Sequence, residues 1–310
     1  MNVFPLKFLK EKKTFKTKSN LFEFKKKKIN IMSLEFSIEE IEEFEKRYFF
    51  GKSNIHIAEN PLDLEWSWNE MNQVVKKLCF FPYQEQLSPE WKRIRTYECF
   101  ISASTIACIT DGSNPYKTEN ELFLEKTNQK PPDLLNDAMI HGILNEDLAA
   151  TMYAKEKKKV LFKFGIIPHS TYKFLGASVD RVTLDGRNVE IKTPLYSTVY
   201  LDEDLEFVLR KYKYYWHQIQ MQAFITGLPI TDFVRYGIPP NENHYEREVL
   251  SIVEVPTDYT WWETYKNNIL SFAEKVISYR KENPNWDKKK WPESEENERR
   301  LKEILSKNKK

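Results

Sequence analysis

The order of the secondary-structure signals predicts an α/β fold, in which a central mixed β-sheet is flanked by helices and preceded by an N-terminal helical region. A long helical segment, residues 133–157, comes before three short apolar segments of strand character, and a helix and a further strand follow. With 310 residues, 41% of them hydrophobic, the chain can bury the core that such a fold needs.

The N-terminal segment, residues 1–31, holds ten lysines against Glu11 and Glu23 and shows no sustained helical periodicity. It is expected to be a basic, disordered arm. Translation from Met32 is the alternative, in which case the arm is an artefact of where the sequence is taken to begin. Ser37 with Glu40 three residues later is a capping-box pattern, which predicts a helix directly after the arm.

Residues typical of helix beginnings and ends predict where the remaining elements lie. Ser88 is a suitable N-cap with Pro89 at the first helical position, and Gly227 is a suitable C-cap. Helices are therefore expected from Ser88 onward and over residues 118–127, 133–157, 205–226 and 259–280. Strands are expected over residues 160–167, 174–184, 189–193, 232–238 and 246–255.

Composition excludes several classes of protein. Lys and Arg total 48 against 46 Asp and Glu, a net charge of +2, so any nucleic-acid binding must come from local patches. Cys79, Cys99 and Cys108 lack the spacing of a disulfide framework or a zinc site. No apolar run approaches the roughly 18 residues of a membrane span, and no signal peptide is evident. A soluble, intracellular protein without a membrane partner is expected.

Charged residues occupy two strand segments that a packed sheet would fill with apolar side chains. Asp180 lies on the first, and Glu190 and Lys192 share one face of the second. A two-residue loop at Asp185-Gly186 would place the two carboxylates on opposite faces of the hairpin. A three-residue loop, residues 185–187, would place Asp180 opposite Lys192 and diagonal to Glu190, within reach of one divalent cation.

A third carboxylate, Glu146, lies on the apolar side of the helix expected over residues 133–157, where it needs a partner. Carboxylate oxygens without a Cys or His cluster suit Mg²⁺ or Mn²⁺ better than zinc. The chemistry that follows is metal-assisted hydrolysis of a phosphate ester, with Lys192 orienting water or steadying charge. The alternative is a structural salt-bridge cluster.

The pattern Asp180, then Glu190-Ile191-Lys192, resembles the PD-(D/E)XK nuclease superfamily, with Val179 in place of the usual proline. Three more stretches are similar to motifs of its YqaJ-type viral recombinases, the family that includes phage lambda exonuclease: QLSPEWKRIRTYECFISAS, HGILNEDLA and YYWHQIQMQAFITG. Together the motifs cover about residues 86–227. The resemblance implies a PD-(D/E)XK restriction-endonuclease-like core at about residues 86–256, in a nuclease domain of residues 32–283, with a charged C-terminal tail over residues 284–310.

The resemblance also implies a role for each matching residue. The metal ligands would be Glu146, Asp180, Glu190 and the backbone carbonyl of Ile191, with Lys192 and Gln218 beside the attacking water. A 5′-phosphate of DNA would bind to Arg95 and Ser104, with Tyr215 bracing the water or the adjacent phosphate. Because Arg95 and Ser104 are nine positions apart where the family usually has seven, Ser102 or Arg93 could take those roles instead.

As a whole, the resemblance implies a metal-dependent exonuclease that acts 5′ to 3′ on double-stranded DNA ends in viral-type recombination, replication or repair. A homotrimer and a single-strand annealing protein would be its partners. The alternatives are a structure-specific or nonspecific endonuclease on the same core and an inactive DNA-binding factor. His217 could contact DNA, although a histidine on the helix surface is the simpler interpretation.

Overall fold

The computed structural model describes residues 57–307, apart from residues 68, 197 and 238–247. The arm at residues 1–31 and the helix expected after it lie outside the described residues. Within the described part, the strands form a sheet of six, in the order β1-β3-β6-β7-β8-β9, and a sheet of three, in the order β2-β5-β4. The large sheet is mixed, because β7 and β8 run parallel while its other neighbouring pairs are antiparallel. The expected mixed α/β architecture is therefore present.

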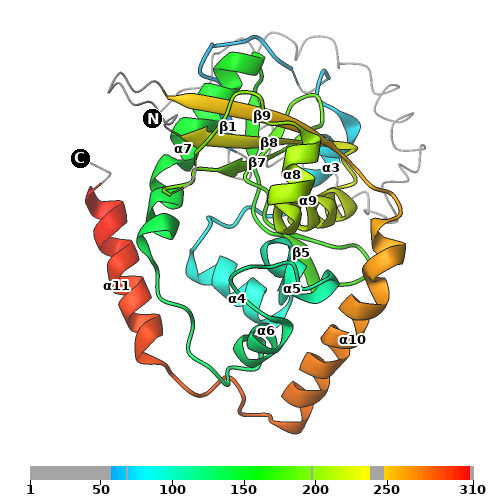
Figure 1. Cartoon of the computed structure of the whole chain (residues 1–310), viewed down its shortest axis with the longest axis vertical. Helices are drawn as coiled ribbons and strands as arrows, with labels where there is room; N and C mark the ends of the chain where they lie inside the picture. The colour runs from blue at the N-terminus through cyan, green and yellow to red at the C-terminus, as the bar shows by residue number, and fades with distance from the viewer. Residues whose placement is uncertain (1–56, 68, 197, 238–247, 308–310) are drawn as a thin grey trace, which may run out of the picture. The chain divides into compact units, whose positions relative to one another are not determined.

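The large sheet comprises β1 (Ile57–Glu59), β3 (Leu161–Lys163), β6 (Arg181–Thr183), β7 (Asn188–Lys192), β8 (Ile230–Gly237) and β9 (Val249–Pro256). Helix α7 (Asp137–Lys157) covers one face, where Ala149, Ala150 and Tyr153 pack on alternate residues of β7 and β8. Helices α8 (Leu205–Lys211) and α9 (Lys213–Thr226) cover the other face, over Phe233 of β8 and residues of β9. Each face of β7 is thus buried by a different helical layer (Figure 1).

The small sheet comprises β2 (Ile101–Ser102), β4 (Ile167–Pro168) and β5 (Leu175–Ala177). Around it lie the shorter helical segments α4 (Pro89–Tyr97), η3 (Ala103–Thr105), α5 (Ala107–Thr110) and α6 (Glu119–Lys126), while α3 (Gln73–Leu78) begins beside the loop between β6 and β7 of the large sheet. Helix α4 begins as expected, because the Ser88 hydroxyl accepts the amide of Trp91 at 3.2 Å and Pro89 needs no amide partner.

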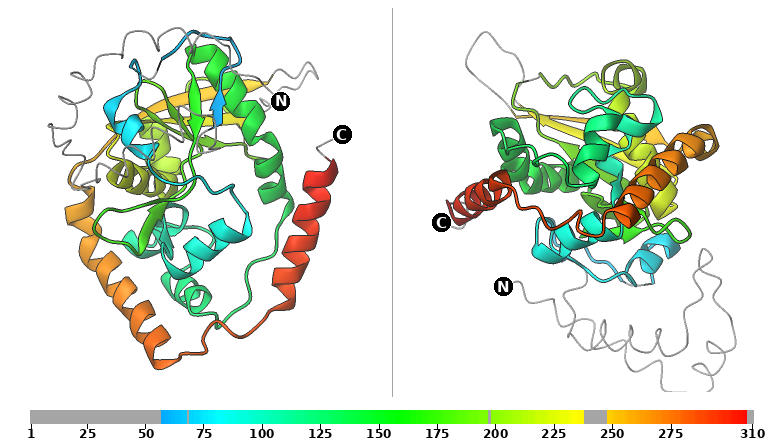
Figure 2. Two further views of the ribbon diagram at one scale, coloured as in Figure 1. Left: turned by 180° about the vertical axis from the view of Figure 1, so that it is seen from behind. Right: turned by 90° about the horizontal axis from the view of Figure 1, so that it is seen from below.

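The C-terminal part consists of α10 (Trp261–Glu282), a loop, and α11 (Pro292–Lys307). The residues expected as a charged tail thus include a helix. The Asn297 side chain on α11 accepts a hydrogen bond from the amide of Leu135 at 2.8 Å and donates one to the carbonyl of Asp133 at 2.9 Å. In Figures 1 and 2, α4 and α6 lie between α10 and α11. No helix of the described part is long and apolar enough to span a membrane.

Several expected elements are divided in the structure. The segment 174–184 gives β5 and β6, which belong to different sheets, and residues 160–167 are likewise shared between β3 and β4. The helix expected over residues 205–226 breaks at Tyr212, whose φ of −132° and ψ of 39° are not helical. The ring of Tyr212 lies 4.5 Å below the guanidinium of Arg235 on β8. The helix expected after Ser88 ends at Tyr97, before β2. These divisions follow contacts with distant residues, which local periodicity does not report.

Candidate active site

The β6–β7 hairpin sets the register of the charged residues. Its loop has three residues, as expected, but they are Leu184 to Gly186 rather than residues 185–187, because Thr183 donates its amide to the carbonyl of Arg187 at 2.9 Å. The pairing of Arg181 with Val189 therefore places Asp180 across from Glu190. The expectation that Asp180 opposes Lys192 is wrong, because the register is shifted by two residues. The carboxylates of Asp180 and Glu190 nevertheless share a face, as expected.

The first turn of α3 decides where this loop falls. Gly186 has a φ of +94°, and a Cβ there would come within 2.6 Å of the Asn72 side chain. The amide of Asn72 donates to the carbonyl of Leu184 at 2.9 Å, and its side chain donates to the carbonyl of Asp185 at 3.2 Å. A left-handed glycine, held by a residue more than a hundred positions earlier, fixes the register.

Asp180 and Glu190 are held by different partners. Asp180 lies just before β6, and its Oδ2 accepts the backbone amide of Ile191 at 2.8 Å. Glu190 is completely buried, and its Oε1 accepts from Gln218 at 2.5 Å and from the ammonium of Lys192. Its Oε2 accepts from Gln222 at 2.6 Å. Both carboxylates therefore have fixed orientations before any ligand binds.

Gln222 is a site residue that the sequence analysis missed. Gln218 and Gln222 are four residues apart on α9, so they lie on one helix face, and this spacing is the signal that could have identified Gln222. In the family motif within YYWHQIQMQAFITG, the glutamine paired with Gln218 is Gln220. The Gln220 side chain, however, donates a hydrogen bond to the carbonyl of Pro256 and accepts one from the amide of Asp258. Gln220 therefore ties α9 to the end of β9, away from Glu190.

The neighbours of Gln218 on α9 have separate roles. The Lys192 ammonium lies 4.8 Å from the ring centroid of Tyr215, which places Tyr215 beside the charged cluster. His217 is completely buried, so its interpretation as a surface or DNA-contacting histidine is wrong. Its Nδ1 accepts from the indole of Trp261 at 3.1 Å, and its Nε2 faces Asp111 at 3.1 Å. His217 is a packing residue between α9 and α10.

Glu146 approaches from α7, on the opposite side of the sheet from Gln218. Its Oε1 accepts from Arg181 at 2.8 Å, and the same guanidinium also pairs with Glu59 at 2.9 Å and Asp147 at 2.5 Å. Arg181 is only 1% exposed. The structure thus brings Asp180, Glu190, Lys192 and Gln218 together directly, and holds Glu146 beside them through Arg181.

Asp180 is the carboxylate that links Glu146 with Glu190 electrostatically. Burial and the charge of Glu190 raise the pKa of Asp180 to about 7. Burial and the charge of Asp180 likewise raise the pKa of Glu146 to about 7. Burial by itself lowers the pKa of Lys192, but Glu190 and Asp180 outweigh it, so the net shift is upward. The carboxylates of the site therefore carry more negative charge than the neighbouring cations neutralise.

The carboxylate oxygens of Glu146, Asp180 and Glu190 are of the type that hard divalent cations prefer as ligands. A bound cation would also relieve the repulsion between these carboxylates. In the part of the chain that the structure describes, no three His, Cys, Asp or Glu side chains are grouped closely enough to hold an ion. Of the three carboxylates expected to be ligands, Glu146 is the one that accepts a hydrogen bond from Arg181.

The residues expected to bind a phosphate also come together. Arg95 on α4 donates from Nη2 to the hydroxyls of Ser102 at 2.9 Å and Ser104 at 3.3 Å. Arg93 instead pairs with Glu90 and Glu98 on the exposed side of α4. Of the alternatives that the sequence left open, Arg95 is therefore the arginine that contacts both serines.

One tryptophan connects this cluster to the carboxylates. The guanidinium of Arg95 lies 4.4 Å from the ring centroid of Trp91, and the Trp91 indole donates to the hydroxyl of Ser178 at 3.5 Å. Ser178 precedes Asp180 by two residues. Trp91 thus lies between Arg95 on one side and the segment that carries Asp180 on the other.

Comparisons with known proteins agree with the motifs. Residues 90–229 match the model of the YqaJ-like viral recombinase domain. The uncharacterized protein R354 of Acanthamoeba polyphaga mimivirus is 29% identical over 181 residues, 55% of this chain and 32% of that protein. The uncharacterized protein YqaJ of Bacillus subtilis (strain 168) is 38% identical over 90 residues, 28% of each chain. This chain thus matches about a third or less of the length of these relatives.

Among solved structures, an alkaline exonuclease from Laribacter hongkongensis matches 62% of this chain and 93% of its own, with a TM-score of 0.47 and 22% identity. The resemblance first seen in the motifs is confirmed over residues 90–229, where the chain matches the model of the YqaJ-like viral recombinase domain.

Proposed function

We propose that this chain is a metal-dependent nuclease of the PD-(D/E)XK type that degrades double-stranded DNA from its ends in the 5′-to-3′ direction. The observation that carries the proposal is the placement of Asp180 across from Glu190, with Lys192 bonded to Glu190 in the same cluster. A buried pair of carboxylates beside a lysine is costly to a sheet unless a ligand uses it. The match to the YqaJ-like family, to which lambda exonuclease is related, makes DNA the expected substrate.

Glu146, Asp180, Glu190 and the carbonyl of Ile191 would hold Mg²⁺ or Mn²⁺. Such an ion, when bound, polarises a scissile phosphate and lowers the pKa of a bound water. Glu146 has to exchange its contact with Arg181 for this role, and Arg181 retains Glu59 and Asp147 as partners. The pairing of Arg181 therefore leaves Glu146 available to turn toward Asp180.

The remaining residues orient the reactants. Gln218 and Gln222 fix both oxygens of Glu190, so that its carboxylate cannot rotate away from Asp180. Lys192 stays protonated because its pKa is raised, and its ammonium can donate to the attacking water or to the phosphate. Tyr215, beneath that ammonium, limits its motion.

Arg95, Ser102 and Ser104 would bind the 5′-phosphate of the degraded strand. Arg95 forms no ion pair among the described residues, so its guanidinium is free to bind a phosphate in a bidentate manner. This pocket is the feature that distinguishes an exonuclease from an endonuclease on the same core.

The test is an assay with Mg²⁺ or Mn²⁺ on three substrates: a linear duplex with 5′-phosphates, the same duplex with 5′-hydroxyls, and a closed circle. We expect degradation of the linear DNA, faster from phosphorylated ends, with release of nucleotides from the 5′ end. Cutting of the closed circle would favour the endonuclease. Binding without any cleavage would favour the inactive DNA-binding factor.

A homotrimer and a single-strand annealing partner are proposals that follow from the family resemblance, whereas a soluble, intracellular location is a proposal that follows from the composition. The mass of the purified protein in solution tests the first of these. Capture of an annealing protein encoded with this chain tests the second.

A further inference from the structure

A basic cleft lies beside Arg95, and about half of the residues that line it lie beyond the family match at residues 90–229. The cleft has a volume of about 510 Å³ and is bounded by the end of α4, the end of α6, the end of α10 and the segment 286–298. Its cations are Arg95, Lys126, Lys130, Arg280, Lys289 and Lys290. Because that part of the wall lies beyond residue 229, the YqaJ-like domain by itself does not build it.

The two arginines of the cleft have no carboxylate partner. Among the described residues, neither Arg95 nor Arg280 forms an ion pair; Arg280 donates instead to the carbonyl of Lys126, from Nε at 3.0 Å and from Nη2 at 2.5 Å. Burial lowers the pKa of each arginine to about 10. A half-buried guanidinium without an anion is poorly compensated, so both groups favour an anionic ligand.

Aromatic rings hold the cations over the cleft. The guanidinium of Arg280 lies 3.9 Å from the ring centroid of Trp286, and the ammonium of Lys289 lies 3.4 Å from that of Trp291. Asn128 fixes both tryptophans, because it donates to the carbonyl of Trp286 at 3.1 Å and accepts from the indole of Trp291 at 2.7 Å. The cleft is therefore preformed.

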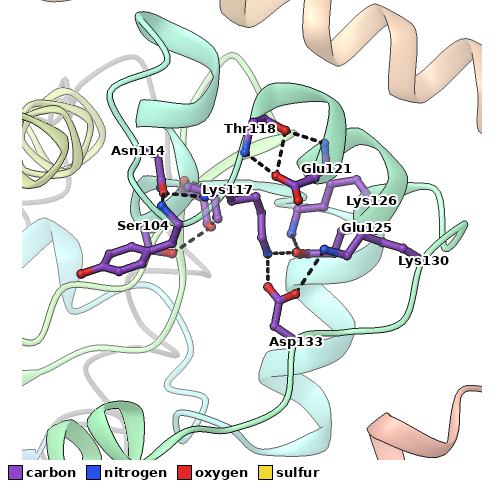
Figure 3. A network of polar contacts seen from close by, with 12 residues as sticks. Ser104, Asn114, Lys117, Thr118, Glu121, Glu125, Lys126, Lys130 and Asp133 are labelled. Atoms are coloured by element: carbon purple, nitrogen blue, oxygen red, sulfur yellow. Dashed lines mark hydrogen bonds and ion pairs between the residues drawn. The ribbon is translucent and has the colours of Figure 1, made fainter.

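Most acids that line the cleft already have partners. Glu125 pairs with Lys117 and Lys126, and Lys117 also pairs with Asp133, as Figure 3 shows beside Ser104. Asp287 accepts the hydroxyl of Tyr97 at 3.0 Å, and Glu298 pairs with Lys92 at 3.3 Å. Against Glu295 and Asp287, whose partner Tyr97 is neutral, four cations remain without ion pairs in the described structure: Arg95, Arg280, Lys289 and Lys290.

We propose that this cleft is a second DNA-binding subsite, in which Arg280, with Lys289 and Lys290, binds a phosphodiester of the DNA backbone next to the end held by Arg95. The inference rests on the proposed function, because DNA at Arg95 is what brings a second phosphate to the cleft. A backbone contact of this kind carries no preference for the chemistry of the 5′ end. It contributes affinity that depends on salt.

The test measures the affinity of a short fluorescent duplex in EDTA over a series of salt concentrations. Arg280→Gln should weaken binding several-fold and equally for 5′-phosphate and 5′-hydroxyl ends. It should also reduce the slope of log Kd against log salt by about one unit. Arg95→Ala should instead reduce the preference for the phosphorylated end.

Lys290→Glu is the second variant, because Lys290 is exposed and has no ion pair in the described structure, so its change leaves the packing intact even if Arg280→Gln does not fold. It should weaken binding in the same manner. Lys275→Gln is the matched control, since Lys275 lies on α10 outside the cleft and pairs with Glu119. This control should bind as the wild type does.

Two results overturn the inference. One is unchanged affinity and salt slope in Lys290→Glu and in a folded Arg280→Gln. The other is a loss confined to phosphorylated ends, which would assign Arg280 to the 5′-phosphate pocket. A wild type that binds no duplex overturns the proposed function as well, whereas a wild type that binds with unaffected variants overturns this inference alone.

Discussion

Two buried charge clusters lie on opposite faces of β7 and β8, and they differ in how their charges are compensated. On the face that α7 covers, Asp232 accepts two bonds from Arg187, at 3.0 and 2.5 Å, and one from Tyr153. On the face that α9 covers, Glu190 lies beside Asp180, and the pKa of Asp180 is raised to about 7 by burial and by Glu190. Lys192 pairs with Glu190, but Asp180 forms no ion pair among the described residues.

The difference separates a structural from a functional use of buried charge. A paired cluster stabilises the fold, and breaking it leaves a buried charge without a partner. An unbalanced cluster costs stability and is retained only where a ligand supplies the missing charge. Substitutions in the two clusters should therefore affect different properties, which the following predictions test.

The largest effect is expected for Asp180→Asn. The change removes a proposed metal ligand and should lower the rate of DNA degradation by about 10³-fold or more. Because it also removes like-charge repulsion with Glu190, the melting temperature in EDTA should stay the same or rise. Rates on linear duplex and thermal unfolding measure both. Unchanged Mg²⁺-dependent degradation would remove Asp180 from the site.

Asp232→Asn should show the opposite pattern. It leaves Arg187 without its buried partner, so the free energy of unfolding should fall by about 3 kcal/mol. The activity of each folded molecule should be retained, because Asp232 lies on the other face of the sheet from Glu190. Denaturant unfolding and active-site-normalised rates give the two values. A large loss of activity without loss of stability would contradict the division into two clusters.

Arg95→Ala extends the comparison to an unpaired cation. It should reduce the rate advantage of 5′-phosphorylated over 5′-hydroxyl ends by about 10-fold, since charge-assisted bonds to the phosphate are lost. Arg93→Ala is the matched control, because Arg93 is on the same helix but pairs with Glu90 and Glu98. If the wild type treats both ends equally, the phosphate pocket has no basis.

The smallest effect concerns pH and metal together. The carboxylates of Asp180 and Glu146 have raised pKa values in the folded protein, so they bind protons more tightly there than in the unfolded chain. Their contribution to stability is therefore present below about pH 4, where both states are protonated, and is lost as the pH rises toward about 7. A divalent cation should restore it above pH 7.

The measurement is the melting temperature with and without Mn²⁺ at pH 5 and pH 8. We expect a rise of about 2 to 4 °C at pH 8 and a smaller one at pH 5, where protons compete for the same oxygens. Asp180→Asn should remove the rise. A melting temperature that ignores Mn²⁺ at both pH values would argue against a shared ion.

The sequence by itself determined the features that depend on near neighbours. Ser88 with Pro89 begins α4, and Gly227 ends α9 with a φ of +73°, because caps involve only the adjoining turn. Alternation placed Asp180 and Glu190 on one face for a hairpin loop of three residues, but not for one of two. The family motifs, moreover, named Arg95 and Ser104 as phosphate-binding residues, with Arg93 and Ser102 as alternatives, and Arg95 does contact both serines.

Tertiary structure decided what depends on residues far apart in the chain. The hairpin register is set by Asn72 against Gly186, the burial of His217 by Trp261, and the orientation of Glu146 by Arg181. Local periodicity carries no information about such partners, because a side chain's charge balance is the sum over whatever the fold packs around it. The clustering of Asp180, Glu190 and Lys192 was therefore predictable from the sequence, and its register and charge compensation were not.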